Sequence, residues 1–261
     1  MIIGQDAPAV MKVMTLNLAH ARGRAIHQAL VRRANIERNL ERVAAVLRRE
    51  GPHLVALQEA DGFSAWSGRF DHVAYLARLA EFPFYVHGDH FRRRKHVSGT
   101  ALLSRLPIVD SASLRFSRSL PTPRKGLVLG RSPLPGRPDL QVEVAAVHLD
   151  FLRPRVRRRQ VRQIIERLAA SGEPRIIMGD FNCQWSGRDE SLRLLARELD
   201  LFPCHTAARG LATFPRLRRR LDWILVSPHF EFLEYRTLPD RLSDHRAVVA
   251  VLKVVQDGAA T

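Results

Sequence analysis

The chain has 261 residues, and its apolar fraction of 46% is typical of a globular protein and excludes a largely disordered chain. No apolar stretch is long enough to span a bilayer, and residues 1–10 lack the basic and apolar regions of a secretory signal. The two cysteines, Cys183 and Cys204, have no metal-ligand spacing and do not indicate a disulfide framework. We therefore expect a cytoplasmic protein.

The net charge is +16, and the 42 basic residues include only four lysines. A field of this sign attracts polyanions such as nucleic acid, or the anionic surface of a membrane. The alternative is a bias toward arginine with no ligand behind it. The positions of the arginines relative to the candidate site residues are therefore the better guide.

The first part of the chain predicts strands and helices in alternation. Lys12–Ala19 alternates apolar and polar residues as a half-buried strand does, and Gly51-Pro52 stops the helix that follows. We predict strands at Lys12–Ala19, Leu54–Gln58 and Phe82–Val86, and helices at Ala25–Glu50 and Ser64–Glu81.

From Gly99 onward, short strand-like runs are separated by proline and glycine, which is typical of a β-meander. The predicted strands of this region are Gly99–Leu103, Val109–Phe116, Lys125–Arg131 and Leu140–His148. The remaining predicted elements are helices at Arg153–Ala170 and Glu190–Leu199, and strands at Arg175–Met178, Leu221–Val226, Phe230–Arg236 and Arg246–Val254.

Strands and helices are predicted in both halves of the chain, and the sequence has no internal repeat and no linker. This pattern favours one α/β domain over residues 11–255, with sheets packed between helices. Residues 1–10 and 256–261 are then short tails, and Met11 is an alternative start. We expect a monomer.

One stretch, Arg175–Asn182, has the clearest candidate chemistry. The apolar run Ile176–Met178 reads as a buried strand that ends at Gly179, and Asp180 and Asn182 follow two residues apart. Residues at this spacing on an extended segment point to the same side, so an anion and an amide emerge together. Asp180 and Asn182 are therefore suited to bind a water molecule and a phosphate oxygen at the same time. The alternative is that the strand simply ends in an Asx-type turn.

Polar groups also follow other predicted strands. Asn17, Glu59 and His148 lie at strand ends, Asp244-His245 precedes the last strand, and Asp222 lies inside the apolar run Leu221–Ile224. Taken singly, Glu59 could be a solvated loop acid, His148 an edge histidine and Asp244-His245 a strand cap. Asp222 is different, because a buried carboxylate needs a partner. The repetition favours a shared site for phosphate or metal chemistry.

The sequence resembles the endonuclease/exonuclease/phosphatase (DNase I-like) superfamily of metal-dependent phosphoesterases. The matching stretches occur in the family's order and span most of the chain. They are Thr15-Leu16-Asn17, Leu57-Gln58-Glu59, Gly99–Ile108, Val147-His148-Leu149, Gly179–Asn182, Leu221–Ile224 and Ser243-Asp244-His245. The resemblance implies a four-layer α-β-β-α sandwich, with two mixed β-sheets face to face, helices outside and the site at the shared rim of the sheets.

The resemblance also implies a cation site. Glu59, assisted by Asn17, looks like the ligand set for Mg²⁺ or Mn²⁺, because hard divalent ions prefer oxygen ligands and keep positions for water and substrate phosphate. Asp244 joins this set directly or holds a second ion. One or two ions are therefore expected.

Catalytic roles follow from the same pattern. Asp180 orients or deprotonates the attacking water, and Asn182 hydrogen-bonds a phosphate oxygen. Asp222 pairs with His245, which then stabilises charge on the phosphoryl group as a cation or, in a rival assignment, acts as the base. His148 is a second donor to the phosphate.

The superfamily covers nucleases, abasic-site enzymes, adduct phosphodiesterases, sphingomyelinases and phosphoinositide phosphatases, so the motifs imply a reaction and leave the substrate open. Basic clusters lie beside three of the motifs, and Trp185 is placed to stack on a base or to cover its loop. The candidate substrate-binding residues are Arg92, Arg93, Arg94, Lys95, Trp185, Arg218, Arg219 and Arg220.

We therefore predict a divalent-metal-dependent phosphoesterase that acts on phosphodiester bonds, with nucleic acid as the first candidate substrate. A phospholipid or sphingomyelin-type phosphodiesterase or a phosphatase of the same superfamily is the alternative, with peripheral contact to anionic lipid. An inactive protein that only binds polyanions is a further alternative, although Glu59, Asp180, Asp222, Asp244 and His245 are all present.

Overall fold

The computed structural model describes residues 9–255 apart from 24, 26–30, 94–95 and 209. Within these ranges the strands form two six-stranded sheets. The first sheet has the order β11-β12-β1-β2-β4-β3, and the second has the order β5-β6-β7-β8-β10-β9. Both sheets are mixed, because β1 pairs with β2 and β7 pairs with β8 in parallel, whereas their other pairs are antiparallel.

The strands of the first sheet are β1 (Val10–Asn17), β2 (Leu54–Asp61), β3 (Phe84–Arg93), β4 (His96–Ser104), β11 (Phe230–Thr237) and β12 (Val248–Val254). The strands of the second sheet are β5 (Val109–Arg115), β6 (Gly126–Leu134), β7 (Arg137–His148), β8 (Arg175–Asp180), β9 (Phe202–Pro203) and β10 (Asp222–Val226). The helices are α1 (Arg33–Glu50), α2 (His72–Leu79), α3 (Pro154–Leu168) and α4 (Ser191–Glu198), with short 3-10 turns η1 (Ala19–Ala21), η3 (Ala65–Ser67) and η4 (Pro215–Leu217).

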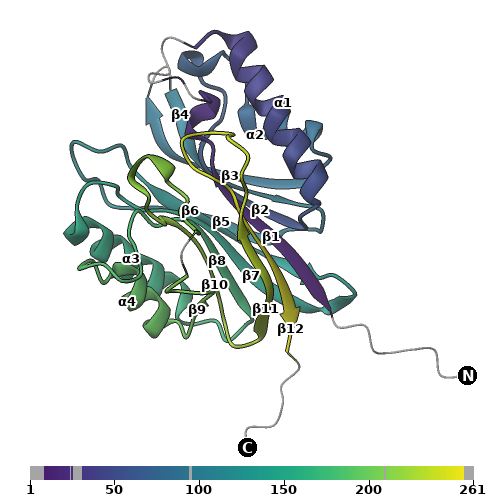
Figure 1. The fold of residues 1–261 in the computed structure, drawn as a ribbon, viewed down its shortest axis with the longest axis vertical. Helices are drawn as coiled ribbons and strands as arrows, with labels where there is room; N and C mark the ends of the chain where they lie inside the picture. The colour runs from purple at the N-terminus through teal and green to yellow at the C-terminus, as the bar shows by residue number, and fades with distance from the viewer. Residues whose placement is uncertain (1–8, 24, 26–30, 94–95, 209, 256–261) are drawn as a thin grey trace, which may run out of the picture.

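The core has three layers of side chains between four layers of backbone. Helices α1 and α2 lie on one side of the paired sheets and α3 and α4 on the other (Figure 1). One apolar cluster joins the first sheet to α1 and α2, a second joins the second sheet to α3 and α4, and a third fills the space between the sheets. This arrangement confirms the predicted four-layer sandwich.

Local sequence explains why the helices begin and end where they do. Helix α1 buries Ile36, Leu40, Val43 and Leu47, which recur every three or four residues and form one apolar face. Gly51 ends this helix at φ 61°, a left-handed conformation that glycine adopts without steric cost. Helix α3 begins at Pro154, and proline is favoured in a first helical turn because it needs no amide partner there.

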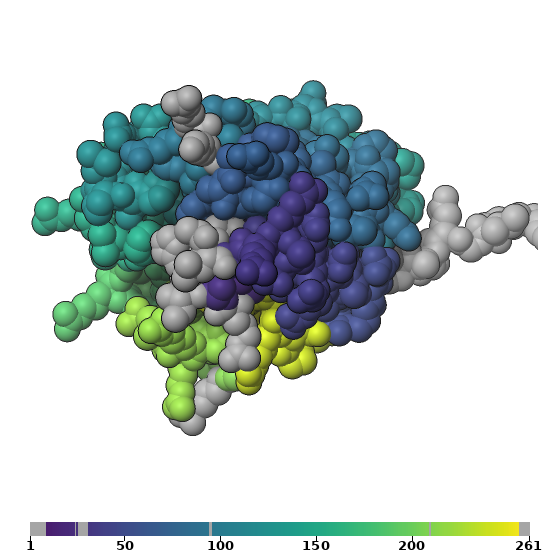
Figure 2. Space-filling model, turned by 90° about the horizontal axis from the view of Figure 1, so that it is seen from above, coloured from purple at the N-terminus to yellow at the C-terminus, as the bar shows by residue number. Residues whose placement is uncertain are grey.

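Strand β1 differs from its prediction as a half-buried strand. It lies in the middle of its sheet, so Met11 and Val13 pack between the sheets while Met14 and Leu16 pack against the helices. The two ends of the sequence meet in this sheet, because β1 pairs with β12. Figure 2 shows the purple N-terminal and yellow C-terminal segments side by side on one face of the molecule.

Two predicted helices begin too early. The first begins at Arg33 in the structure and not at Ala25, and residues 26–30 lie outside the described ranges. The second was predicted to begin at Ser64, but the first part of that range forms the η3 turn and α2 begins only at His72. Gly68 at φ 99° interrupts a helix there, and the side chain of Asp71 accepts a hydrogen bond from the amide of Ala74 and caps α2.

Two predicted strand boundaries were also wrong. The short strand predicted at Phe82–Val86 is the beginning of the longer β3, which forms a hairpin with β4. Arg92 and Arg93 therefore lie on a strand and not in a loop. The last strand begins at Val248, two residues later than predicted.

Gly179 controls the position of the segment that carries Asp180. Its φ is 150°, and a Cβ atom added there would lie 1.9 Å from the carbonyl oxygen of Val147 on the neighbouring strand. We expect Gly179→Ala to lower the free energy of unfolding by about 3 kcal/mol or more, because backbone must move to admit the methyl group. Urea unfolding followed by circular dichroism measures this loss.

The matched control is Gly172→Ala, because a Cβ atom at Gly172 meets no atom within 4 Å. We expect this control to change the free energy of unfolding by less than about 0.5 kcal/mol. Equal urea midpoints for Gly179→Ala and the unmodified protein would contradict the steric argument.

Candidate active site

Three adjacent strands of the second sheet place their polar residues in one row. His148 ends β7, Asp180 ends β8 and Asp222 begins β10. Asp180 is the register partner of both neighbours, with His148 on one side and Asp222 on the other. Because register partners lie directly opposite each other, these three side chains gather at one edge of the sheet.

The first sheet contributes Asn17 to the same row. Its Nδ2 donates a hydrogen bond of 3.0 Å to Oδ2 of Asp180, and its Oδ1 accepts one of 2.9 Å from the amide of Ala19. The side chain of Asn17 is thus held at both ends, and it links the two sheets at their shared rim. Its predicted role as a cation ligand stays a proposal.

Asp180 lies at the centre of the group. Its Oδ2 is 3.5 Å from Nε2 of His148 and 3.8 Å from Nε2 of His245, and its Oδ1 accepts from the amide of Asn182. Burial and the negative charge of Asp222 together raise the pKa of Asp180 to about 7. A carboxyl group with this pKa is able to exchange a proton near neutral pH.

Asp222 and His245 form a tight buried pair. Nδ1 of His245 lies 2.8 Å from Oδ2 of Asp222 and donates to it, which leaves Nε2 directed toward Asp180. Burial acts to lower the pKa of His245, but the carboxylates of Asp222 and Asp180 outweigh it and raise the pKa to about 10. The imidazole is therefore a cation at neutral pH.

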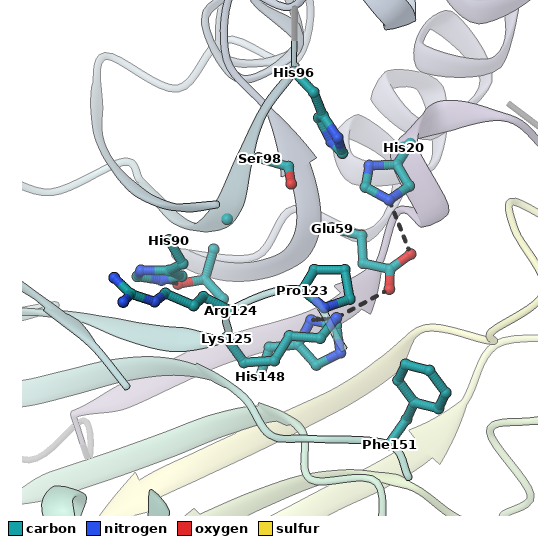
Figure 3. Close-up of a pocket in the computed structure, with 12 residues that line it drawn as sticks. His20, Glu59, His90, His96, Ser98, Pro123, Arg124, Lys125, His148 and Phe151 are labelled. Carbon is teal, nitrogen blue, oxygen red and sulfur yellow. Dashed lines mark hydrogen bonds and ion pairs between the residues drawn. The ribbon is translucent and has the colours of Figure 1, made fainter. Parts of the chain in front are cut away.

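His148 has the opposite protonation state. Burial and the charge of Lys125 lower its pKa well below the usual value, so the ring is neutral. Nζ of Lys125 lies 3.3 Å from Nδ1 of His148 and donates to it (Figure 3). The ring hydrogen is therefore on Nε2, which lies 3.5 Å from Oδ2 of Asp180. His148 is consequently a donor directed into the site.

Glu59 lies at a β-bulge in β2, where the register with β4 shifts between Gln58 and Ala60. Its φ is 47°, and the bulge directs its side chain into the pocket that His20, Lys125 and His148 also line (Figure 3). Burial alone would raise the pKa of Glu59, but the charges of Lys125 and His20 hold it below its usual range. Glu59 is therefore an ionised carboxylate.

Asp244 and Glu59 share one guanidinium group. NH2 of Arg22 lies 2.6 Å from Oδ2 of Asp244, and its NH1 lies 3.9 Å from Oε2 of Glu59. Two carboxylates from the first sheet and from the loop before β12 thus hold a positive charge between them. Carboxylate and amide oxygens are the ligands that hard divalent cations prefer, and the role of Glu59, Asp244 and Asn17 as such ligands stays a proposal.

Asn182 adopts φ 52°, and its Nδ2 donates to the carbonyl oxygen of Leu149 at 3.0 Å. This bond fixes the amide beside the loop that follows His148. One N–H of the same group is left to donate elsewhere, as the role predicted for Asn182 requires.

The candidate substrate-binding residues separate into different environments. Arg92 and Arg93 are exposed on β3 and line a cavity, whereas Arg94 and Lys95 lie outside the described residues. Trp185 packs on the core beside Trp223, with ring centroids 6.1 Å apart. That contact accounts for its position without a base.

The three arginines before β10 are also not equivalent. Arg218 and Arg219 are exposed near η4. Arg220 is buried, with its guanidinium 3.8 Å from the ring centroid of Trp223 and donating to the carbonyl oxygens of Cys204 and His205. Both terminal nitrogen atoms of this guanidinium group therefore donate within the fold.

Several site residues were missed from the sequence. Lys125 bridges His148 and Glu59, with Nζ 3.4 Å from Oε1 of the latter, and His20 lies 3.5 Å from Oε2 of Glu59. The missed arginines that line the same cavity as Arg92 are Arg115, Arg118 and Arg124. One available signal was Lys125 itself, a rare lysine at the first position of a predicted strand in an arginine-rich chain.

The comparisons with known proteins agree with this geometry. The model of the Endonuclease/Exonuclease/phosphatase family matches residues 14–245. The chain belongs to this family, whose members are hydrolases of phosphoesters and generally depend on a divalent metal. Among the described residues, two groups of acids and histidines lie close enough to hold an ion: His20, Asp61 and His96, and Asp180, Asp222 and His245. A comparison with curated proteins finds no match.

Solved structures with the same fold have low sequence identity. An endonuclease/exonuclease/phosphatase from Beutenbergia cavernae is 21% identical with a TM-score of 0.77, covering 97% of this chain and 73% of that one. The human Nocturnin catalytic domain is 18% identical with a TM-score of 0.71, covering 96% of each chain. A mannosyl-6-phosphatase from Bacteroides thetaiotaomicron is 17% identical with a TM-score of 0.69, covering 93% and 99%.

The pairing of Asp222 with His245 generates a direct prediction. We expect Asp222→Asn to lower the pKa of His245 from about 10 by about 1 to 3 pH units, because an adjacent opposite charge is removed while burial remains. An NMR titration of the His245 ring resonances measures the change. The control is Asp139→Asn, an exposed carboxylate at the other end of β7, which should leave His245 unchanged. An unaltered pKa in Asp222→Asn would contradict the assigned pair.

Proposed function

We propose that the protein hydrolyses phosphodiester bonds of nucleic acid with the help of Mg²⁺ or Mn²⁺. The observation that supports this substrate is a basic groove that adjoins the pocket of Glu59, Lys125 and His148. Its cavity of about 450 Å³ shares His90, Pro123 and Arg124 with that pocket. We call it the arginine groove, and its charged lining is Arg92, Arg93, Arg115, Arg118 and Arg124.

The arginine groove lies where β3 of the first sheet meets β5 of the second, and two of its arginines are held there by Asp89. NH2 of Arg115 donates to the carbonyl oxygen of Asp89 at 2.7 Å, and Arg92 pairs with the side chain of Asp89. The first contact joins β5 to β3, and the second lies within β3. All five arginines line the cavity, where guanidinium groups suit the successive phosphates of a polynucleotide. Such contacts position a backbone without reading its sequence.

The attacking water belongs at Asp180. In its ionised form this carboxylate accepts a proton from water, and the bonds from Asn17 and Asn182 fix the direction of its oxygens. With a pKa near 7, Asp180 is ionised in a large part of the molecules at neutral pH. The free N–H of the Asn182 amide then donates to the phosphate.

The surrounding cations stabilise the charge that develops on the phosphoryl group. His245 as an imidazolium and His148 through its Nε2–H are donors that point toward Asp180 from two sides. Lys125 adds a positive charge next to His148. A cation held by Glu59, Asn17 and Asp244 would supply Lewis acid stabilisation of the same phosphate.

A specific observation also supports a second substrate. Leu120, Phe151 and Leu152 are 63%, 56% and 51% exposed, and Phe151 lines the catalytic pocket while Leu120 lines the arginine groove. Arg153 donates to the carbonyl oxygen of Leu120, so the two loops are adjacent. An apolar rim with arginines suits an anionic phospholipid surface. Among the helices of the described ranges, none is long and apolar enough to cross a membrane.

The test is a panel of hydrolysis assays in Mg²⁺ or Mn²⁺, each repeated with EDTA. The substrates are supercoiled DNA, single-stranded DNA, RNA, abasic duplex, a 5′-tyrosyl adduct and sphingomyelin in anionic vesicles. We expect EDTA-sensitive hydrolysis of at least one nucleic acid at a higher kcat/KM than of sphingomyelin. Faster hydrolysis of sphingomyelin would favour the lipid substrate, and no hydrolysis in the panel would contradict both.

The active-site assignment is tested in the same panel with Asp180→Asn, which has nearly the same shape and cannot accept the water proton. We expect kcat to fall by about 10²-fold or more, since general base catalysis typically contributes about 10²–10⁴-fold. An unchanged thermal midpoint shows that the fold is intact. Substantial turnover by purified Asp180→Asn would exclude the proposed role.

The arginine groove is tested with the triple variant Arg92→Ala, Arg93→Ala, Arg115→Ala. We expect KM for single-stranded DNA to rise at least about tenfold and its salt dependence to weaken, with a loss of about 0.7 in the log–log slope for each phosphate contact removed. The kcat for a small diester, bis(p-nitrophenyl) phosphate, should stay within about twofold, because it reaches only the catalytic pocket.

A triple variant of exposed arginines on the outer helices is the control, because it removes the same charge elsewhere. It consists of Arg38→Ala, Arg167→Ala and Arg197→Ala. An equal rise in KM for both triple variants would show that net charge alone, and not the arginine groove, holds the DNA.

A further inference from the structure

His20 lies on an unusual turn beside Glu59. The η1 turn directly follows β1, and its three residues, Ala19, His20 and Ala21, all have positive φ angles of 48°, 56° and 55°. Such angles are costly for residues other than glycine, and they persist where the surrounding structure requires them. Here the turn brings the His20 ring over the catalytic pocket, where it points toward Glu59 (Figure 3).

The ring of His20 is fixed by a carboxylate on one side. Its Nδ1 lies 2.7 Å from Oδ1 of Asp61, and because a carboxylate only accepts, Nδ1 carries the hydrogen. Asp61 is fully buried and also accepts from Nε1 of Trp66 at 3.3 Å. This carboxylate is thus itself held in a single orientation.

Aromatic neighbours fix the plane of the ring. Trp66 and His96 contact it edge-on, with ring centroids 5.3 and 5.4 Å away. The hydrogen bond and these contacts leave one ring atom of His20 directed at the pocket. That atom is Nε2, which lies 3.5 Å from Oε2 of Glu59.

This arrangement is the one in which proteins present histidine to a metal. A metal-binding imidazole usually donates its other N–H to a carboxylate, which sets the tautomer and makes the free nitrogen more basic. Ligand nitrogens and oxygens lie about 2.0–2.2 Å from an ion such as Zn²⁺, so two donor atoms 3.5 Å apart can reach the same ion. We propose that His20, oriented by Asp61, is a nitrogen ligand to the divalent cation of Glu59, an inference that rests on the cation site of the proposed function.

A nitrogen ligand changes which ion the site prefers. Mg²⁺ is bound almost entirely by oxygen, whereas imidazole suits transition metals. A site of Glu59, Asp244, Asn17 and His20 therefore binds Mn²⁺ more tightly than Mg²⁺. The competing role for His20 is a fully protonated bridge between Asp61 and Glu59, which binds no ion.

The test uses Mn²⁺ alone with the purified full chain. Pulsed electron paramagnetic resonance of bound Mn²⁺ should show coupling to a ¹⁴N nucleus, and this coupling should be absent in His20→Gln. Calorimetry should give a Kd for Mn²⁺ that is at least about tenfold higher in His20→Gln than in the unmodified protein. The Kd for Mg²⁺ should change less. Asp61→Asn should raise the Kd for Mn²⁺ by about 10- to 100-fold, because the carboxylate that orients His20 is lost.

The matched control is His229→Gln, a half-buried histidine that follows β10 at the end of the strand opposite Asp222. It should keep both the ¹⁴N coupling and the affinity. Thermal unfolding without metal shows whether each variant is folded. If His20→Gln is not folded, His20→Asn replaces it in the test.

Absence of ¹⁴N coupling in the unmodified protein, its persistence without His20, or failure to bind Mn²⁺ would each overturn the proposal. Its failure is distinguishable from failure of the proposed function. EDTA-sensitive DNA hydrolysis without ¹⁴N coupling leaves the nuclease proposal standing and removes the His20 ligand. Coupling to ¹⁴N without hydrolysis of any nucleic acid leaves the His20 ligand standing and removes the nuclease proposal.

Discussion

The hydrogen bond from Nδ2 of Asn17 to Oδ2 of Asp180 joins the two sheets at the rim where the site lies. Its partners are 163 residues apart in the sequence, and each ends a strand in the middle of its sheet. Burial makes this bond necessary, because a carboxylate removed from water needs donors. With Asp180 held there, His148 and His245 approach it from two sides, and Glu59 lies across the pocket on the first sheet.

The same constraint divides the charges of the site into two regions. At the end of the second sheet, Asp222 pairs with His245 from the loop before β12, and this buried pair places a cation next to Asp180. On the first sheet, Glu59 stays ionised among basic neighbours and shares the guanidinium group of Arg22 with Asp244. Lys125 lies between the regions and contacts both. A phosphate entering the pocket would therefore meet positive charge from several directions.

The resemblance of the ordered motifs to the DNase I-like superfamily implied the four layers. The strand ends were predictable from the residues themselves, because apolar runs that stop at a polar residue report both a buried strand and its exposed end. Asp222 is the clearest example, since a carboxylate inside an apolar run requires a partner, and Nδ1 of His245 lies 2.8 Å from it. The contacts of Lys125 and His20 with Glu59, and the arginine groove as a whole beyond Arg92 and Arg93, were not predictable. Their positions depend on how the sheets pack, on a turn with three positive φ angles and on a hairpin longer than its apolar run. Arg220 likewise belonged to a basic cluster in the sequence but stacks on Trp223 in the fold.

The central claim is that a water positioned by Asp180 attacks phosphorus directly, with no covalent intermediate on the protein. The stereochemistry of hydrolysis tests it most directly, using a DNA substrate with a chiral phosphorothioate of known configuration in ¹⁸O-labelled water. Direct attack by water predicts inversion at phosphorus and one ¹⁸O atom in the product phosphorothioate. Retention of configuration would contradict it, because two successive displacements would then be needed.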